Sequence, residues 1–150
     1  MSSEQMNYDF SRFLEAQKFD YPIALKEVKS GKKENHWIWY IFPIIDGYRN
    51  TTMCNRYSIK SLDEAKEYMK NAILKHNLIE ISEALLQLGT NDANAIFGSP
   101  DDLKVQACMT LFSIATPEET VFQKVLDKYY NGEQNKKTLD ILKTLNNSKM

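Results

Sequence analysis

The sequence predicts an all-α protein: a single compact, irregular multihelical domain of about six to eight helices spanning residues 1–150. Three observations favour this class. Apolar residues recur three and four positions apart along most of the chain, which is the spacing of one helix face. Proline, glycine and capping side chains stand where such segments would begin or end. The strict apolar and polar alternation of a half-buried strand is almost absent.

Composition supports one globular domain and excludes several function classes. A chain of 150 residues can bury a sizeable core, and its 26% charged and 43% hydrophobic residues are typical of soluble domains. The net charge is −1, and the one dense basic cluster, Lys29, Lys32 and Lys33, is flanked by Glu27 and Glu34. This balance indicates a solvated loop rather than a phosphate-binding stripe, so we expect no nucleic-acid partner.

The chain shows no membrane, secretion or metal signal. No segment approaches the roughly 20 apolar residues that cross a bilayer, and residues 1–5 lack the features of a signal peptide. We therefore expect a cytoplasmic protein with no membrane partner. Cys54 and Cys108 form no C-x-x-C pair and are expected to be free thiols. With only His36 and His76 and no suitable carboxylate clustering, we predict no metal and no cofactor.

The first third of the chain predicts two helices followed by an aromatic segment. Asp9 can cap a first helix, and Asp20 with Pro22 predicts the start of a second, which Gly31 ends. One face of the first helix contains Phe10, Phe13, Leu14 and Gln17. The aromatic run is His36-Trp37-Ile38-Trp39-Tyr40-Ile41-Phe42-Pro43. Its composition favours a strand, but no partner strand is evident, so a helix is predicted.

The middle of the chain contains clear helix boundaries. Ser61 and Glu64 match a capping box, in which each side chain accepts from the other residue's backbone N–H. A longer helix runs from about residue 73 to Gly89, with a break near Asn71. Asn91 or Asp92 then opens a short helical turn that passes through Ile96 and Phe97 and closes at Gly98.

Two later segments repeat a start signal with a hydroxyl, a proline and two acids. Ser99-Pro100-Asp101-Asp102 predicts a helix to about Ala115, and Thr116-Pro117-Glu118-Glu119 predicts one to about Asn131, stopped by Gly132. A last helix contains Leu139, Leu142 and Leu145. The termini, at about 1–7 and 146–150, are expected to fray.

The aromatic run and the start of the helix at residue 101 are the two candidate sites. His36 can act as a general acid or base, or it can cap a helix. Trp39 and Phe42 are expected to anchor the core, with His36 and Trp37 at its edge. Lys104, in the first turn after residues 98–102, can bind an anion or pair with a nearby acid. Arg56-Tyr57, before the Ser61 cap, is a third candidate, with a solvated arginine as the alternative.

A set of spaced motifs resembles the multihelical family known as domain of unknown function 1810 (DUF1810), sometimes labelled calpastatin-like. The motifs are Phe13-x-x-Ala16-Gln17, Tyr21-x-x-Ala24-Leu25-x-Glu27-x-x-x-Gly31-x-Lys33, the aromatic run, Tyr57-x-Ile59, Asp63-Glu64-Ala65, Ile96-Phe97-Gly98-x-x-Asp101-x-x-Lys104 and Met109-Thr110-Leu111-Phe112. They cover residues from about 10 to 142. The resemblance implies an all-α fold and no established activity.

The resemblance also implies a set of distinctive positions. These are His36, Trp37, Trp39, Phe42, Pro43, Tyr57, Gly98, Asp101, Lys104, Thr110 and Phe112. Core packing does not require this mixture of polar and charged residues, so it indicates a pocket lined by aromatics. The chain departs from the family pattern at Ile44, where Gln is usual, and at Ala107 and Cys108, where two serines are usual. These departures imply a changed or impaired ligand site if the Gln or the first Ser binds the ligand.

A shorter resemblance links Ala16-Gln17-Lys18-Phe19 to helical N-glycosidases. Together these features suggest a pocket for a small anionic or nucleotide-like ligand, contacted by Trp37, Trp39, Tyr57, Lys104 and Thr110. His36 and Asp101 would supply proton transfer if the protein hydrolyses an N-glycosidic bond. The alternative is a non-enzymatic protein–protein interaction module. The oligomeric state and whether the protein is an enzyme stay open.

Overall fold

The computed structural model describes residues 8–148, and within this range the chain forms nine α-helices and no strand beyond one isolated bridge. The helices are α1 (Ser11–Ser30), α2 (Ile38–Ile41), α3 (Thr52–Tyr57), α4 (Leu62–Tyr68), α5 (Ala72–Leu86), α6 (Ala93–Phe97), α7 (Asp101–Ala115), α8 (Val121–Tyr130) and α9 (Lys136–Ser148). The all-α prediction is confirmed, with slightly more helices than expected because several are short.

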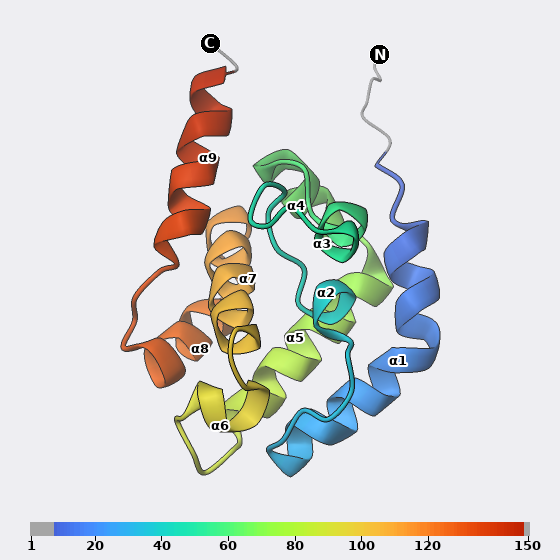
Figure 1. The fold of residues 1–150 in the computed structure, drawn as a ribbon, viewed down its shortest axis with the longest axis vertical. Coiled ribbons are helices and arrows are strands. Elements are labelled where there is room, and N and C mark those ends of the chain that lie inside the picture. The colour runs from blue at the N-terminus through green and yellow to red at the C-terminus, as the bar shows by residue number, and fades with distance from the viewer. Residues whose placement is uncertain (1–7, 149–150) are drawn as a thin grey trace.

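Helix α7 lies at the centre of the packing. It contacts α4, α6, α8 and α9, while α5 packs against α1 and α8. In Figure 1, α9 and α1 lie on opposite sides of the molecule, and the short helices α2, α3 and α4 lie between them. This arrangement brings the aromatic run of α2 close to α1 and α3.

Helix α1 is continuous through Pro22, so the predicted break near Asp20 is wrong. Pro22 has no N–H to offer the carbonyl of Lys18, and both residues are exposed, so water can hydrate that carbonyl. Tyr21, the residue before the proline, holds α1 to α5 by donating its hydroxyl to Glu80 Oε1 (2.7 Å). The helix ends as predicted at Gly31, which has a φ of 84°.

The middle of the aromatic run, Ile38–Ile41, forms a single helical turn, α2, so the helical prediction is confirmed for these four residues and not for the two residues at either end of the run. The backbone carbonyl of Tyr40 accepts a hydrogen bond from Gln17 Nε2 (2.7 Å). A side chain of α1 thus satisfies a carbonyl that has no partner within the short helix α2. Phe42 follows the turn and is buried against Phe97, with ring centroids 5.7 Å apart. Most side chains of the run are therefore buried in the core, among them Trp37, Ile41 and Phe42.

The start of α4 shows half of the expected capping box. Ser61 Oγ accepts from the Glu64 N–H (3.1 Å), but the Glu64 carboxylate accepts from the N–H of Lys60 rather than that of Ser61. The other two middle boundaries agree with the prediction. Asn71 Oδ1 accepts from two amides at the start of α5, and Asp92 caps α6.

The two proline start signals are displaced in the structure. Helix α7 begins at Asp101 and has no side-chain cap, so Ser99 is not its N-cap. Thr116 closes α7 instead of opening α8, because its hydroxyl donates to Phe112 O (2.8 Å) and its position before Pro117 disfavours the helical conformation. Helix α8 begins later, at Val121, and ends at Asn131 and Gly132 as expected.

Helix α9 reaches Ser148, so residues 146–148 are helical where fraying was expected. The predictions for residues 1–7 and 149–150 lie outside the described residues. No helix within residues 8–148 is both long and apolar enough to span a membrane. Cys54 and Cys108 are buried free thiols, and burial raises the pKa of each.

Candidate functional site

Three charged side chains meet where the loop after α1 approaches the first turn of α7. Asp101 Oδ2 lies 2.9 Å from Lys33 Nζ, and Asp101 Oδ1 lies 3.1 Å from Lys104 Nζ. Each carboxylate oxygen therefore binds one ammonium group. We call Lys33, Asp101 and Lys104 the charged cluster.

Each lysine of the charged cluster also lies against a tryptophan ring. Lys104 Nζ is 3.8 Å from the Trp39 ring centroid, and Lys33 Nζ is 5.3 Å from that of Trp37. Both distances are within the range of cation–π attraction. The chain contains only these two tryptophans, so both of its indoles border one charged cluster.

The loop that carries Lys33 is held by a buried carboxylate. Glu27 Oε1 accepts from the backbone N–H of Glu34 (2.7 Å), the N–H of Asn35 (3.0 Å) and Trp37 Nε1 (2.8 Å). Burial alone would raise the pKa of Glu27, but these hydrogen bonds outweigh it and lower the pKa to about 2. Glu27 thus stays ionised and fixes both the loop and the Trp37 indole.

The charged cluster holds more positive than negative charge. Burial opposes ionisation of Asp101, yet the two ammonium groups lower its pKa, so it is a carboxylate at neutral pH. The Lys33 and Lys104 side chains are each only 7% exposed, and Asp101 is their one ion-pair partner among the described residues. Two poorly hydrated ammonium groups therefore share one carboxylate.

Four of the predicted site residues meet here, although the two tryptophans exchange roles. Trp37, expected at the edge, is 1% exposed because its indole N–H is satisfied by Glu27, whereas Trp39, expected in the core, is half-buried. Asp101 and Lys104 lie together as predicted. Lys104 also forms the local salt bridge with a nearby acid that the sequence offered as the alternative to anion binding.

Sequence reasoning missed two contributors to this site. Lys33 was assigned to a solvated basic loop, but its side chain is buried against Asp101 and Trp37. Glu27 was interpreted as a flanking acid, yet it organises the loop. The signal that pointed to both was the family-like spacing Glu27-x-x-x-Gly31-x-Lys33 rather than the local charge pattern.

The remaining predicted residues do not join the charged cluster. His36 is exposed, and within residues 8–148 its side chain makes no hydrogen bond or ion pair. Tyr57 packs on Tyr40, with centroids 5.0 Å apart. Thr110 is fully buried, where its hydroxyl donates to Gln106 O and accepts from the N–H of Asn135, which joins α7 to the start of α9.

The glycosidase-like stretch is divided between the interior and the surface, and the departures from the family pattern are buried. Gln17 is buried and bonds Tyr40, Tyr68 and Asn77. Phe19 is 72% exposed. The departures at Ile44, Ala107 and Cys108 are at most 3% exposed, so these side chains belong to the packed interior.

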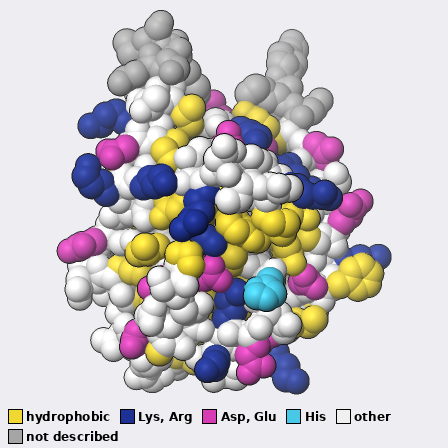
Figure 2. All heavy atoms as spheres, in the orientation of Figure 1, with side chains coloured by type: hydrophobic (Ala, Val, Ile, Leu, Met, Phe, Trp, Pro, Cys, Tyr) yellow, Lys and Arg dark blue, Asp and Glu magenta, His cyan; other side chains and the backbone are white. Residues whose placement is uncertain are grey.

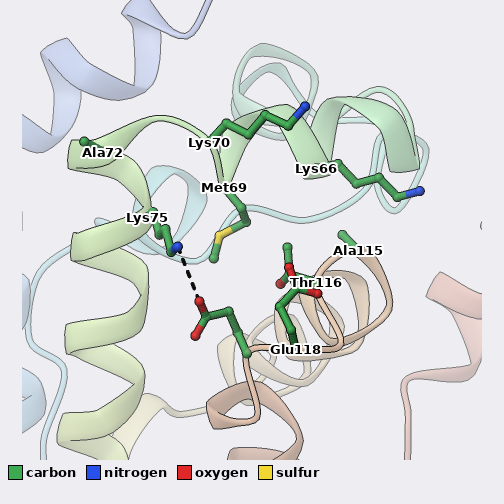
Figure 3. A pocket seen from close by; sticks show the side chains of 9 residues that line it. Lys66, Met69, Lys70, Ala72, Lys75, Ala115, Thr116 and Glu118 are labelled. Atoms are coloured by element: carbon green, nitrogen blue, oxygen red, sulfur yellow. Dashed lines mark ion pairs between the residues drawn. The ribbon is translucent and has the colours of Figure 1, made fainter.

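The surface over α2 is apolar in its middle and charged at its margin. Figure 2 shows hydrophobic side chains gathered around α2, with basic and acidic side chains beside them. A hollow of about 600 Å³ lies elsewhere, between the α4–α5 junction and the α7–α8 connection. Figure 3 shows Lys66 and Lys70 extending away from it, while Lys75 pairs with Glu119 at 3.4 Å. That hollow therefore offers no unpaired cation aimed into its interior.

Comparisons with known proteins identify the class and then the family. The chain has 36% sequence identity to a conserved hypothetical protein, Rv1873, from Mycobacterium tuberculosis, whose crystal structure matches with a TM-score of 0.88 over 90% of this chain and 96% of the other. The family model "Protein of unknown function (DUF1810)" matches residues 7–142. The chain belongs to this family. No curated protein matches it.

Proposed function

We propose that the surface bordered by the charged cluster and Trp39 binds a small anionic or nucleotide-like ligand. The anion would lie against Lys33 and Lys104, and an aromatic ring would stack on the half-buried Trp39. The observation that carries this proposal is the pair of poorly hydrated ammonium groups that share a single carboxylate. A phosphate or carboxylate would supply the second negative charge.

The arrangement supports binding better than hydrolysis of an N-glycosidic bond. That reaction needs an acid for the departing base and a carboxylate for the positive charge that develops on the sugar. The charge of Asp101 is already compensated by two lysines, and its lowered pKa makes it a poor proton donor. His36 makes no contact with Asp101 that would let the two act together.

A protein–protein interaction module is the second proposed function, and one surface of α1 favours it. Phe19 and Ile23 lie one turn apart and are 72% and 44% exposed. If this face binds a partner or a second copy, Phe19→Ser should abolish an association that light scattering detects in the wild type. The charged-cluster variants should leave that association unchanged.

The proposed setting is the cytoplasm. Both cysteines are buried and unpaired, as a reducing compartment allows. Fluorescence of the tagged full chain in its own cells tests this assignment. Exclusive recovery from the medium or from a membrane fraction would contradict it.

Ligand binding can be tested by intrinsic tryptophan fluorescence and thermal denaturation with adenosine 5′-monophosphate and ribose 5-phosphate. Because both tryptophans border the site, a bound ligand should change their emission. A ligand at about 100 times its Kd should also stabilise the protein by about 2.7 kcal/mol. Lys33→Met and Lys104→Met should lose both effects, whereas Lys66→Met, at the hollow of Figure 3, should keep them.

The result that would contradict the proposal is equally specific. Wild-type protein with unchanged emission and unchanged melting temperature excludes these compounds as ligands. An effect that persists at full strength in both cluster variants places the binding site elsewhere.

A further inference from the structure

A second, more polar hollow lies between the loop that follows α2 and the start of α9. Its volume is about 540 Å³, and it is lined by Gly47, Tyr48, Arg49, Asn50, Thr51 and Lys137. The lining residues come from two segments that are far apart in sequence. The hollow therefore exists only because α9 folds back beside this loop.

The lining of this hollow contains two cations and no carboxylate. Within residues 8–148, neither Arg49 nor Lys137 forms an ion pair. Asp46 is the neighbouring acid in the loop, but it is bound by the Ser58 hydroxyl (2.8 Å) and lies 3.4 Å from Lys60 Nζ. Asp46 and Asp140 line an adjoining hollow together with Lys137, but Asp140 pairs with Lys136 at 3.4 Å. Arg49 and Lys137 thus line the same hollow, and no carboxylate among the described residues is within ion-pair distance of either.

Lys137 lies beside a buried aromatic ring. Lys137 Nζ lies 4.9 Å from the Tyr48 ring centroid, and Tyr48 is 7% exposed, with its hydroxyl accepting from Asn135 Nδ2 (3.3 Å). Gly47 has a φ of 92°, a conformation that other residues rarely adopt, and this turns the loop toward α9. The exposed ammonium group of Lys137 is therefore within cation–π distance of a buried ring at the edge of the hollow.

Two uncharged donors complete the lining. Asn50 Oδ1 accepts from Asn55 Nδ2 (3.1 Å), which leaves the Asn50 amide group to donate. Thr51 Oγ1 accepts from the Cys54 N–H (3.2 Å), so its hydroxyl proton is available for another acceptor. An arginine fork, an ammonium group, an amide and a hydroxyl are the donors that hold phosphate oxygens in proteins.

We propose that the hollow lined by Arg49, Asn50, Thr51 and Lys137 is a phosphate-binding site. It takes inorganic phosphate or the phosphate group of a monoester. It shares no residue with the charged cluster, so it stands independently of the function proposed above.

The test is an NMR titration of the full chain with inorganic phosphate, repeated with glycerol 2-phosphate. Saturable shifts of the Gly47, Asn50 and Thr51 amides are expected. Loss of one charge-assisted contact should raise the Kd about tenfold in Arg49→Gln and in Lys137→Met. Lys137→Arg keeps the charge and should retain binding. Lys143→Met, also an exposed lysine of α9, is the matched control and should bind as wild type.

The two probes identify the source of the phosphate. Tighter binding of glycerol 2-phosphate supports a site for a phosphate monoester, and tighter binding of inorganic phosphate supports a site for the free ion. Shifts that never saturate, or equal weakening in Lys143→Met, would overturn the site. Lys104→Met should leave these shifts unchanged, so failure of the ligand proposed at the charged cluster does not affect this result.

Discussion

At the residue scale, Asp101 separates two ammonium groups that would otherwise face each other in a poorly hydrated place. Lys33 belongs to the loop after α1, and Lys104 to the first full turn of α7. The carboxylate therefore joins two segments as well as compensating charge. The three substitutions within the charged cluster should have unequal effects on stability.

Asp101→Asn should destabilise the protein by about 3 kcal/mol, because it leaves two buried ammonium groups without their counterion. Lys33→Met or Lys104→Met should cost about 1 kcal/mol or less, since each leaves a neutral ion pair and replaces the lysine stem with one of similar volume. Urea denaturation at pH 7 measures all three. Equal losses in the three variants would contradict the shared-carboxylate description.

Glu27 makes stability depend on acid pH. Its pKa falls from an ordinary 4.5 to about 2 in the folded protein, so folding favours the ionised form. Its contribution is fully present above pH 4.5 and is lost as the pH falls toward 2. We expect Glu27→Gln to weaken stability at pH 7 by about 1 to 3 kcal/mol, because four donor groups, two of them on Asn35, lose a charged acceptor.

Denaturation of Glu27→Gln at several pH values between 6 and 2 checks the sign of this effect. The difference between wild type and variant should shrink as the pH falls. A difference that is constant over this range would show that the charge of Glu27 is not what stabilises the loop.

At the element scale, α1 shows how a helix can pass through a proline when the lost hydrogen bond faces solvent. Figure 1 shows α1 changing direction along its length. Contacts on both sides of the proline tie α1 to its surroundings: Gln17, before it, bonds Tyr40 and Asn77, and Glu27, after it, accepts from Trp37 Nε1. These contacts hold the helix together across Pro22, which local signals alone would treat as a boundary.

Pro22→Ala should stabilise the protein by about 1 kcal/mol. The substitution restores an N–H donor in the helix interior, a gain that the greater freedom of the unfolded chain partly offsets. Pro117→Ala is the matched control, because Pro117 lies in an exposed turn and its loss should give no gain. Equilibrium urea unfolding compares them, and a destabilised Pro22→Ala would mean that the helix requires the proline.

Asn71 marks the boundary between α4 and α5. Its Oδ1 accepts from the N–H groups of Ile73 (3.1 Å) and Leu74 (3.0 Å). Asn71→Ala should lower the free energy of unfolding by about 1 kcal/mol, and Asn71→Asp should preserve it. The melting temperatures of the two variants provide the comparison. Equal loss in both would show that capping is not the contribution of this residue.

At the scale of the whole molecule, α7 and α9 differ in how much of their apolar side-chain surface is buried against the rest of the protein. Helix α7 contributes a run of buried residues at the centre of the core, whereas the described hydrophobic side chains of α9 are only partly buried. The start of α9 is attached through Asn135, whose N–H bonds Thr110 Oγ1 at 2.8 Å. This difference in burial predicts that α9 unfolds locally before α7.

Native-state hydrogen exchange should show α9 opening at a lower free energy than α7, since local opening follows the amount of buried apolar contact. Thr110→Val removes the bond to Asn135 and should speed exchange in α9 more than in α5. Uniform protection across all three helices would contradict this order.

The local part of the fold was predictable because its causes are local. Asn71, Asp92 and Gly31 bound helices as expected, since each acts on backbone groups within a few residues. Thr116 and Pro22 were misassigned because each has two compatible roles. A threonine can cap either end of a helix, and a proline can lie inside a helix or at its start. Which of these positions Thr116 and Pro22 occupy depends on how the helices pack against one another.

The sequence by itself determined the helical class, most helix boundaries and the candidates Asp101 and Lys104, because periodicity, capping and spacing are properties of neighbouring residues. Only the tertiary structure decided that Lys33 would share Asp101 with Lys104, that Trp37 rather than Trp39 would be buried, and that His36 would stay in solvent. These outcomes depend on how α1, α2 and α7 pack, and a side chain's burial and charge partners follow from segments distant in sequence.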